Sequence, residues 1–126
     1  MLKIRKEQME AFKNDNLRKF ADRMALHLKK FWPEECKSLG EKGVRDSIMT
    51  GIKNAEKYGI VIEYDVASYI DMMYALCFDF DTNPRTNWAG RILNNPNLPA
   101  HAKIEKLDER TKQELRMPVD RQNRGV

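Results

Sequence analysis

Residues 16–32, NLRKFADRMALHLKKFW, carry the clearest helical pattern in the 126-residue chain. Apolar side chains recur there at spacings of three and four residues, the period of one buried helix face. They are Leu17, Phe20, Ala21, Met24, Ala25, Leu28 and Phe31. Pro33 cannot continue the helix, because proline has no backbone N–H to donate. The pattern predicts a long helix from about Arg5 to Trp32, with a looser segment at residues 14–16.

A second apolar stripe predicts a helix over residues 41–58, after a short helical turn that starts at Pro33 and ends at Gly40. The stripe consists of Val44, Ile48, Ile52 and Ala55. Gly51 lies within it, where glycine costs up to about 1 kcal/mol relative to alanine. We therefore expect a neighbouring helix to approach closely at Gly51. Gly59 is expected to cap this helix in the left-handed conformation, with Ile60 supplying the apolar contact that follows such a cap.

The most hydrophobic segment predicts a central helix that begins near Asp65, a plausible N-cap, and ends near Phe80. Its apolar face consists of Val66, Tyr69, Ile70, Met73, Leu76 and Cys77. A first breaker segment, 81–87, precedes a short helix, 88–93, and a second, 94–99, separates it from a final helix, 100–116. No segment shows the sustained alternation of a strand.

The chain is therefore predicted to be all-α, a small bundle of four to five helices with short connectors. We expect residues 1–116 to form a single helical domain and residues 117–126 to form a flexible, disordered tail. The side chains expected to be largely buried are Phe20, Met24, Leu28, Ile48, Ile52, Ile70, Met73 and Trp88.

The composition excludes several classes of protein. Hydrophobic residues make up 41% of the chain, which is enough for one modest core. No apolar run approaches the about 18 residues that span a bilayer. Residues 1–10 have no signal-peptide core, and two cysteines, Cys36 and Cys77, are too few for a disulfide framework. We expect a cytoplasmic protein with free thiols and no membrane partner.

The charge is uneven along the chain. Residues 1–32 carry nine Lys/Arg and four Asp/Glu, whereas residues 61–100 carry two Lys/Arg and five Asp/Glu. A nucleic-acid binder usually concentrates its bases on one face, with few acids to repel phosphate. Because acids interrupt the basic segment here, nucleic-acid binding is kept as the alternative function only.

Residues 79–83, DFDTN, resemble the start of a calcium loop, but Pro84 stands where that loop needs glycine and Gly90 where it needs glutamate. We expect Asp79 and Asp81 to cap or hydrogen-bond the loop backbone while Phe80 packs inward. His27 is expected to be a partly exposed helix histidine, and neither it nor His101 has zinc-ligand spacing to other residues. No catalytic constellation is recognisable, so the sequence predicts no enzyme, no catalytic residue, no cofactor and no metal site.

Several short blocks together resemble a set of small, uncharacterised bacterial helical proteins that are often encoded beside type VI secretion spike and effector genes. The blocks are residues 7–9, 23–24, 27–28, 39–40, 58–60, 69–71, 79–81 and 88–89. The resemblance covers roughly residues 4 to 93. It implies a protein-binding role: an adaptor or chaperone that docks a secreted effector or spike component, or an immunity protein that masks a toxin.

Two regions are candidates for the partner-binding surface. The favoured one is the end of the central helix and the following loop, because its acids could attract a basic partner. It consists of Tyr74, Phe78, Asp79, Phe80, Asp81, Arg85 and Trp88. The other is Met9 and Phe12, near the N-terminus. The competing interpretation of the first region is that Phe78, Phe80 and Trp88 seal the end of the bundle.

Overall fold

The computed structural model describes the backbone of residues 15–125 and the side chains of residues 16–115. Five α-helices and one short 3-10 turn follow each other along this part of the chain, with no strand between residues 15 and 125. They are α2 (Asp15–Phe31), α3 (Pro33–Lys57), α4 (Glu63–Ala75), η1 (Pro84–Thr86), α5 (Asn87–Leu93) and α6 (Ala100–Gly125). The predicted all-α bundle is confirmed.

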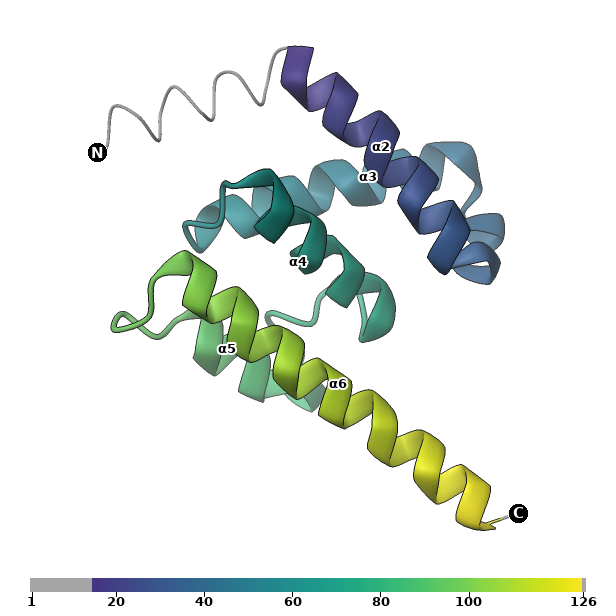
Figure 1. Ribbon diagram of the computed structural model, residues 1–126, viewed down its shortest axis with the longest axis vertical. Helices are drawn as coiled ribbons and strands as arrows, with labels where there is room; N and C mark the ends of the chain where they lie inside the picture. Colours follow the sequence, from purple (N-terminus) through teal and green to yellow (C-terminus); the bar gives the residue numbers. More distant parts are fainter. Residues whose placement is uncertain (1–14, 126) are drawn as a thin grey trace.

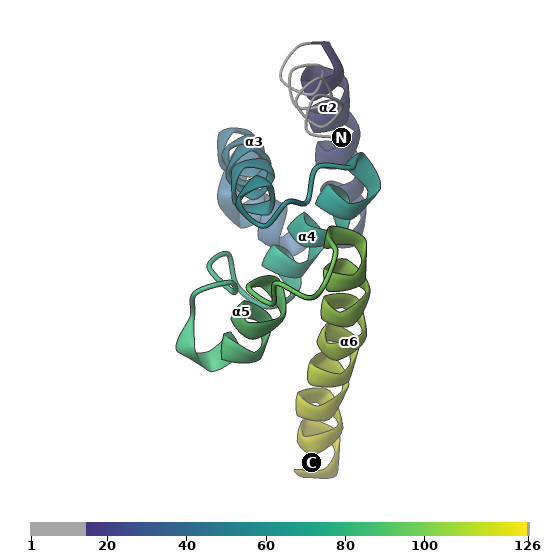
Figure 2. The ribbon, with the colours of Figure 1, turned by 90° about the vertical axis from the view of Figure 1, so that its left-hand side faces the viewer.

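Helix α4 lies at the centre of the molecule. Figures 1 and 2 show the pair α2 and α3 on one side of it and the pair α5 and α6 on the other. Its residues Tyr69 and Ile70 are completely buried, and Val66 and Met73 nearly so. The most hydrophobic segment therefore forms the central helix, as its composition predicts.

All eight side chains predicted for the core are buried. They are Phe20, Met24, Leu28, Ile48, Ile52, Ile70, Met73 and Trp88. They come from α2, α3, α4 and α5, so one continuous core joins these helices. Burial of such apolar faces is the main stabilising term of a bundle of this size.

Gly51 is the point of closest approach between α3 and α4. A Cβ atom built on it would lie 2.5 Å from Ile70 Cγ1 and 3.0 Å from Met73 Sδ, closer than packed atoms come. The glycine that is unfavourable within a helix is therefore explained by the neighbouring helix, as expected.

Glycines also set the ends of the helical segments as predicted. Gly40, at φ 77°, interrupts the helical backbone within α3 and separates the first turns from the longer segment that follows. Gly59, at φ 80°, follows the end of α3. Its N–H donates to the Glu56 carbonyl and that of Ile60 donates to the Ala55 carbonyl, each at 3.0 Å, which is the Schellman pattern.

Helix α4 differs from its predicted bounds at both ends. It begins at Glu63 with Ile62 in the capping position, so the prediction of Asp65 as the N-cap is wrong. It ends at Ala75 rather than near Phe80. A turn follows in the loop beyond the helix, where the N–H groups of Thr82 and Asn83 both donate to the Asp79 carbonyl.

The final helix is longer than predicted, and the predicted start of the first helix cannot be compared with the structure. Helix α6 extends to Gly125, past the predicted end at Arg116. Since side chains are described only up to residue 115, a separate tail over 117–126 stays a prediction. The expected start of the first helix and the candidates Met9 and Phe12 lie outside the described residues.

Candidate functional site

The predicted loop surface is mostly turned into the molecule. Phe80 is completely buried, and Tyr74, Asp81 and Trp88 are also buried. Only Phe78, Asp79 and Arg85 of the predicted set are exposed. The structure therefore places Phe80 and Trp88 where the competing interpretation puts them, at the sealed end of the bundle.

The two acids of this loop are engaged within the protein. Asp81 accepts a hydrogen bond of 2.7 Å from Tyr58 Oη, which ties the loop to the end of α3. Burial, and then this carboxylate, raise the pKa of Tyr58 to about 12. Asp79 accepts a bond of 3.2 Å from Asn83 Nδ2, and this bond is the main cause that lowers the pKa of Asp79. Phe80 packs inward as predicted, but the two carboxylates bind the side chains of Tyr58 and Asn83 and not the predicted loop backbone.

A groove of about 270 Å³ lies elsewhere, between α2, α4 and α6, and sequence reasoning missed it. We call it the α2–α4–α6 groove. Its lining residues are His27, Phe31, Trp32, Ser68, Asp71, Met72, Ala75, Asp108, Thr111, Lys112 and Leu115.

The Asp71 carboxylate is the polar centre of this groove. His27 Nε2 lies 2.9 and 3.0 Å from its two oxygens. Trp32 Nε1 donates a further bond of 3.1 Å to Oδ1. The Asp71 side chain keeps 35% of its surface exposed. Two donors from the end of α2 thus orient a carboxylate that is still accessible from outside.

Apolar side chains border the carboxylate. Phe31 is 59% exposed and Leu115 is 40% exposed, which is high for large apolar residues. Thr111 is buried, yet its Oγ1 has no hydrogen-bond partner among the described residues. Thr111 therefore lies in the wall of the groove and offers its hydroxyl to no other side chain within residues 16–115.

The groove was missed because its parts are distant in the sequence. His27 is indeed a partly exposed helix histidine, as expected, but its partner is 44 residues away. One signal was available: Asp71 is a lone acid within the middle of the most hydrophobic helix. A charge at such a position usually has a partner or a function.

The nucleophilic side chains Ser68 and Cys36 are not activated in the structure of residues 16–115. Ser68 lines the same groove, but its Oγ donates to the Tyr64 carbonyl of its own helix at 3.2 Å. Burial raises the pKa of the Cys36 thiol, which disfavours the reactive thiolate. Among the residues whose placement is described, no group of three or more His, Cys, Asp or Glu could hold a metal ion.

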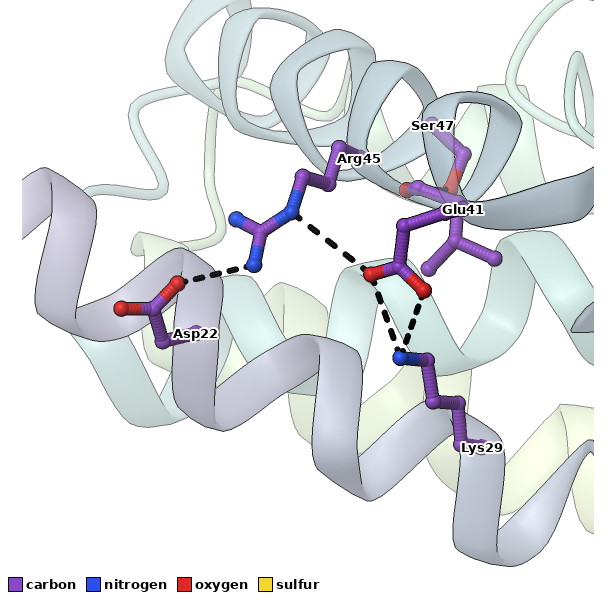
Figure 3. A network of polar contacts seen from close by, with 6 residues as sticks. Asp22, Lys29, Glu41, Arg45 and Ser47 are labelled. Atoms are coloured by element: carbon purple, nitrogen blue, oxygen red, sulfur yellow. Dashed lines mark hydrogen bonds and ion pairs between the residues drawn. The ribbon is translucent and has the colours of Figure 1, made fainter.

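The bases of α2 and α3 are interleaved with acids. Figure 3 shows Arg45 between Asp22 and Glu41, at 3.0 and 3.8 Å, and Lys29 donating to Glu41 at 2.8 and 3.1 Å. This hydrogen bond from Lys29 is the main cause that lowers the pKa of Glu41. These exposed pairs contribute little to stability, but they place negative charge where a phosphate backbone would bind.

Comparison with known proteins gives no family model that matches the chain, and no curated protein or solved structure that is significantly similar to it. Within residues 15–125, none of the helices combines the length and the apolar character that crossing a bilayer requires.

Proposed function

We propose that this protein is a non-enzymatic protein-binding module that docks its partner in the α2–α4–α6 groove. The observation that carries the proposal is the pair of exposed apolar side chains, Phe31 and Leu115, beside the oriented carboxylate of Asp71. Interfaces concentrate their binding energy in a few apolar anchors with fixed polar groups next to them. This groove offers that combination, whereas most of the predicted loop surface is buried.

The finer role follows from the resemblance described above. It supports an adaptor or chaperone that docks a secreted effector or spike component, or an immunity protein that masks a toxin. Both roles need a stable complex with one protein. They differ in the consequence of binding, because an immunity protein suppresses the activity of its partner and an adaptor does not.

The test compares two variants of α2 that differ in position and not in chemistry. Phe31→Asp places a charge in the groove, and Leu26→Asp places the same charge at a side chain that is 69% exposed and does not line it. Each variant is co-expressed with the proteins encoded by the adjacent genes. Complexes are then measured by size-exclusion chromatography and calorimetry.

We expect one neighbouring gene product to bind the parent and Leu26→Asp, and to lose at least about tenfold in affinity for Phe31→Asp, as loss of a central anchor requires. Circular dichroism melts check that both variants fold. Equal binding by both variants contradicts docking in the groove, and the absence of any complex contradicts the adaptor and immunity roles. If the bound product is toxic, suppression of its toxicity identifies an immunity protein.

A further inference from the structure

The α2–α4–α6 groove has an unbalanced charge. Three charged side chains other than histidine line it: Asp71, Asp108 and Lys112. Lys112 Nζ lies 3.0 Å from Asp108 Oδ2, so these two neutralise each other on α6. No lysine or arginine among the described residues forms an ion pair with Asp71, whose donors are a histidine ring and an indole.

Aromatic rings stand beside this carboxylate. Phe31 and Trp32 line the groove next to Asp71, and the Phe31 ring already has Lys30 Nζ at 5.4 Å from its centroid. A carboxylate in a groove that aromatic side chains line suits a guanidinium better than an ammonium. The guanidinium is planar, donates in a fork to a carboxylate, and stacks on aromatic rings.

We propose that the groove binds a partner segment that presents one arginine to Asp71 and a bulky apolar side chain between Phe31 and Leu115. This inference rests on the proposed function and specifies the chemistry of the partner. The charge complementarity to Asp71 selects this occupant over a purely apolar segment.

The probe is a set of fluorescein-labelled helical peptides that share one leucine face and differ only in a central residue, which is Arg, Gln or Glu. Fluorescence anisotropy measures the affinity of each peptide for the full chain. We expect the Arg peptide to bind at least about tenfold tighter than the Gln peptide, and the Glu peptide not to bind. The preference for Arg should decline as salt is added.

Asp71→Asn and Asp108→Asn form a matched pair of variants. The first should abolish the preference for Arg over Gln. The second should keep it, because Asp108 already pairs with Lys112. If Asp71→Asn does not fold, the salt dependence of the Arg preference in the parent decides instead.

Three results overturn the inference: equal binding of the Arg and Gln peptides, no binding of any peptide, or a dimer of the parent in sedimentation that Phe31→Asp dissociates. The proposed function fails separately. A neighbouring gene product that is lost in Phe31→Asp, together with peptides that show no Arg preference, retains the docking groove and discards the arginine. An Arg preference that depends on Asp71, with a gene product that binds Phe31→Asp normally, retains the arginine site and discards the groove as the docking site of that gene product.

Discussion

Gly51 of α3 lies against Ile70 of α4 so closely that a Cβ atom at position 51 would be 2.5 Å from Ile70 Cγ1. This contact sets the distance between the two helices at the centre of the core. It also positions the remainder of α4, which carries Asp71 next to Ile70.

The substitution Gly51→Ala should therefore destabilise the protein by about 1–3 kcal/mol, as overpacking of a core does. On helix propensity alone, the same substitution would stabilise α3 by up to about 1 kcal/mol. The sign of the change in the free energy of unfolding, measured by urea denaturation, thus distinguishes the two effects. A stabilised variant would show that α3 and α4 are further apart than described.

Ile70→Ala should cost about 2–5 kcal/mol by leaving a cavity in the core. It also removes Cγ1, the atom nearest to position 51. In the Ile70→Ala background, Gly51→Ala should accordingly cost less than it does in the parent, with a coupling of at least about 0.5 kcal/mol. Additive effects in this double-mutant cycle would place the two residues out of contact.

The stability of the protein should fall in alkali as Tyr58 ionises. Its pKa is raised from an ordinary value of about 10 to about 12, first by burial and then by Asp81. A group with a raised pKa in the folded state contributes stability that is complete below about pH 10 and is lost as the pH rises through about 12. Burial raises the pKa of Tyr69 as well, which adds to the same loss. Urea melts at a series of pH values, with tyrosinate absorbance, measure it.

Tyr58→Phe provides the comparison, because lysines that titrate in the same range affect both proteins equally. The variant should be less stable near neutral pH by about 1–3 kcal/mol, since buried Asp81 loses its donor. Its stability should then decline less steeply than that of the parent between about pH 10 and 12. Parallel curves for the two proteins would show that Tyr58 does not ionise in this way.

His101→Ala should destabilise the junction of α4 and α6. His101 Nδ1 lies 3.1 Å from Oδ1 of Asp65, whose side chain is only 3% exposed. Removing the partner of a buried carboxylate costs about 1–3 kcal/mol. Glu105→Ala is the control, since Glu105 makes a longer, exposed contact of 3.7 Å with the same histidine, and it should change stability by less than about 0.5 kcal/mol. Equal effects of the two substitutions on the melting temperature would contradict this assignment.

Tight binding to nucleic acid is not expected. Acids such as Glu41 and Asp22 are paired with the bases of α2 and α3, so the surface formed by residues 16–115 lacks the unbroken positive face that phosphate contacts require. Fluorescence polarisation with duplex DNA and single-stranded RNA at physiological ionic strength should show no sub-micromolar affinity. A sub-micromolar affinity that falls steeply with salt would favour the nucleic-acid alternative.

Features that repeat along one helix could be predicted from the sequence. The apolar stripe that contains Leu28, and the one that contains Ile70, identify their buried faces because helix geometry places such residues together. The close approach of a helix to Gly51 could be predicted because glycine destabilises a helix interior and is favoured there only where a neighbour leaves no room for a side chain. Gly59 could be assigned because few other residues adopt its backbone conformation.

Features that depend on how helices cross could not be predicted in this way. The approach of His27 to Asp71 requires the packing of α2 on α4 to be known, and no local pattern encodes it. The burial of Asp81 likewise depends on Tyr58, which the loop meets only after the chain has folded back on α3. The sequence therefore predicts a surface at the aromatic and acidic loop and does not predict the groove.

The two tryptophans provide the most direct test of docking in the α2–α4–α6 groove. Trp32 Nε1 donates to Asp71 in the groove, whereas Trp88 is buried at the end of the bundle that the sequence suggested as a surface. Their indole N–H resonances, assigned with Trp32→Phe, are followed by ¹H–¹⁵N correlation spectra as the bound neighbouring gene product is added. Our account predicts that the Trp32 indole resonance shifts and the Trp88 resonance does not. A shift of Trp88 with Trp32 unchanged would contradict it.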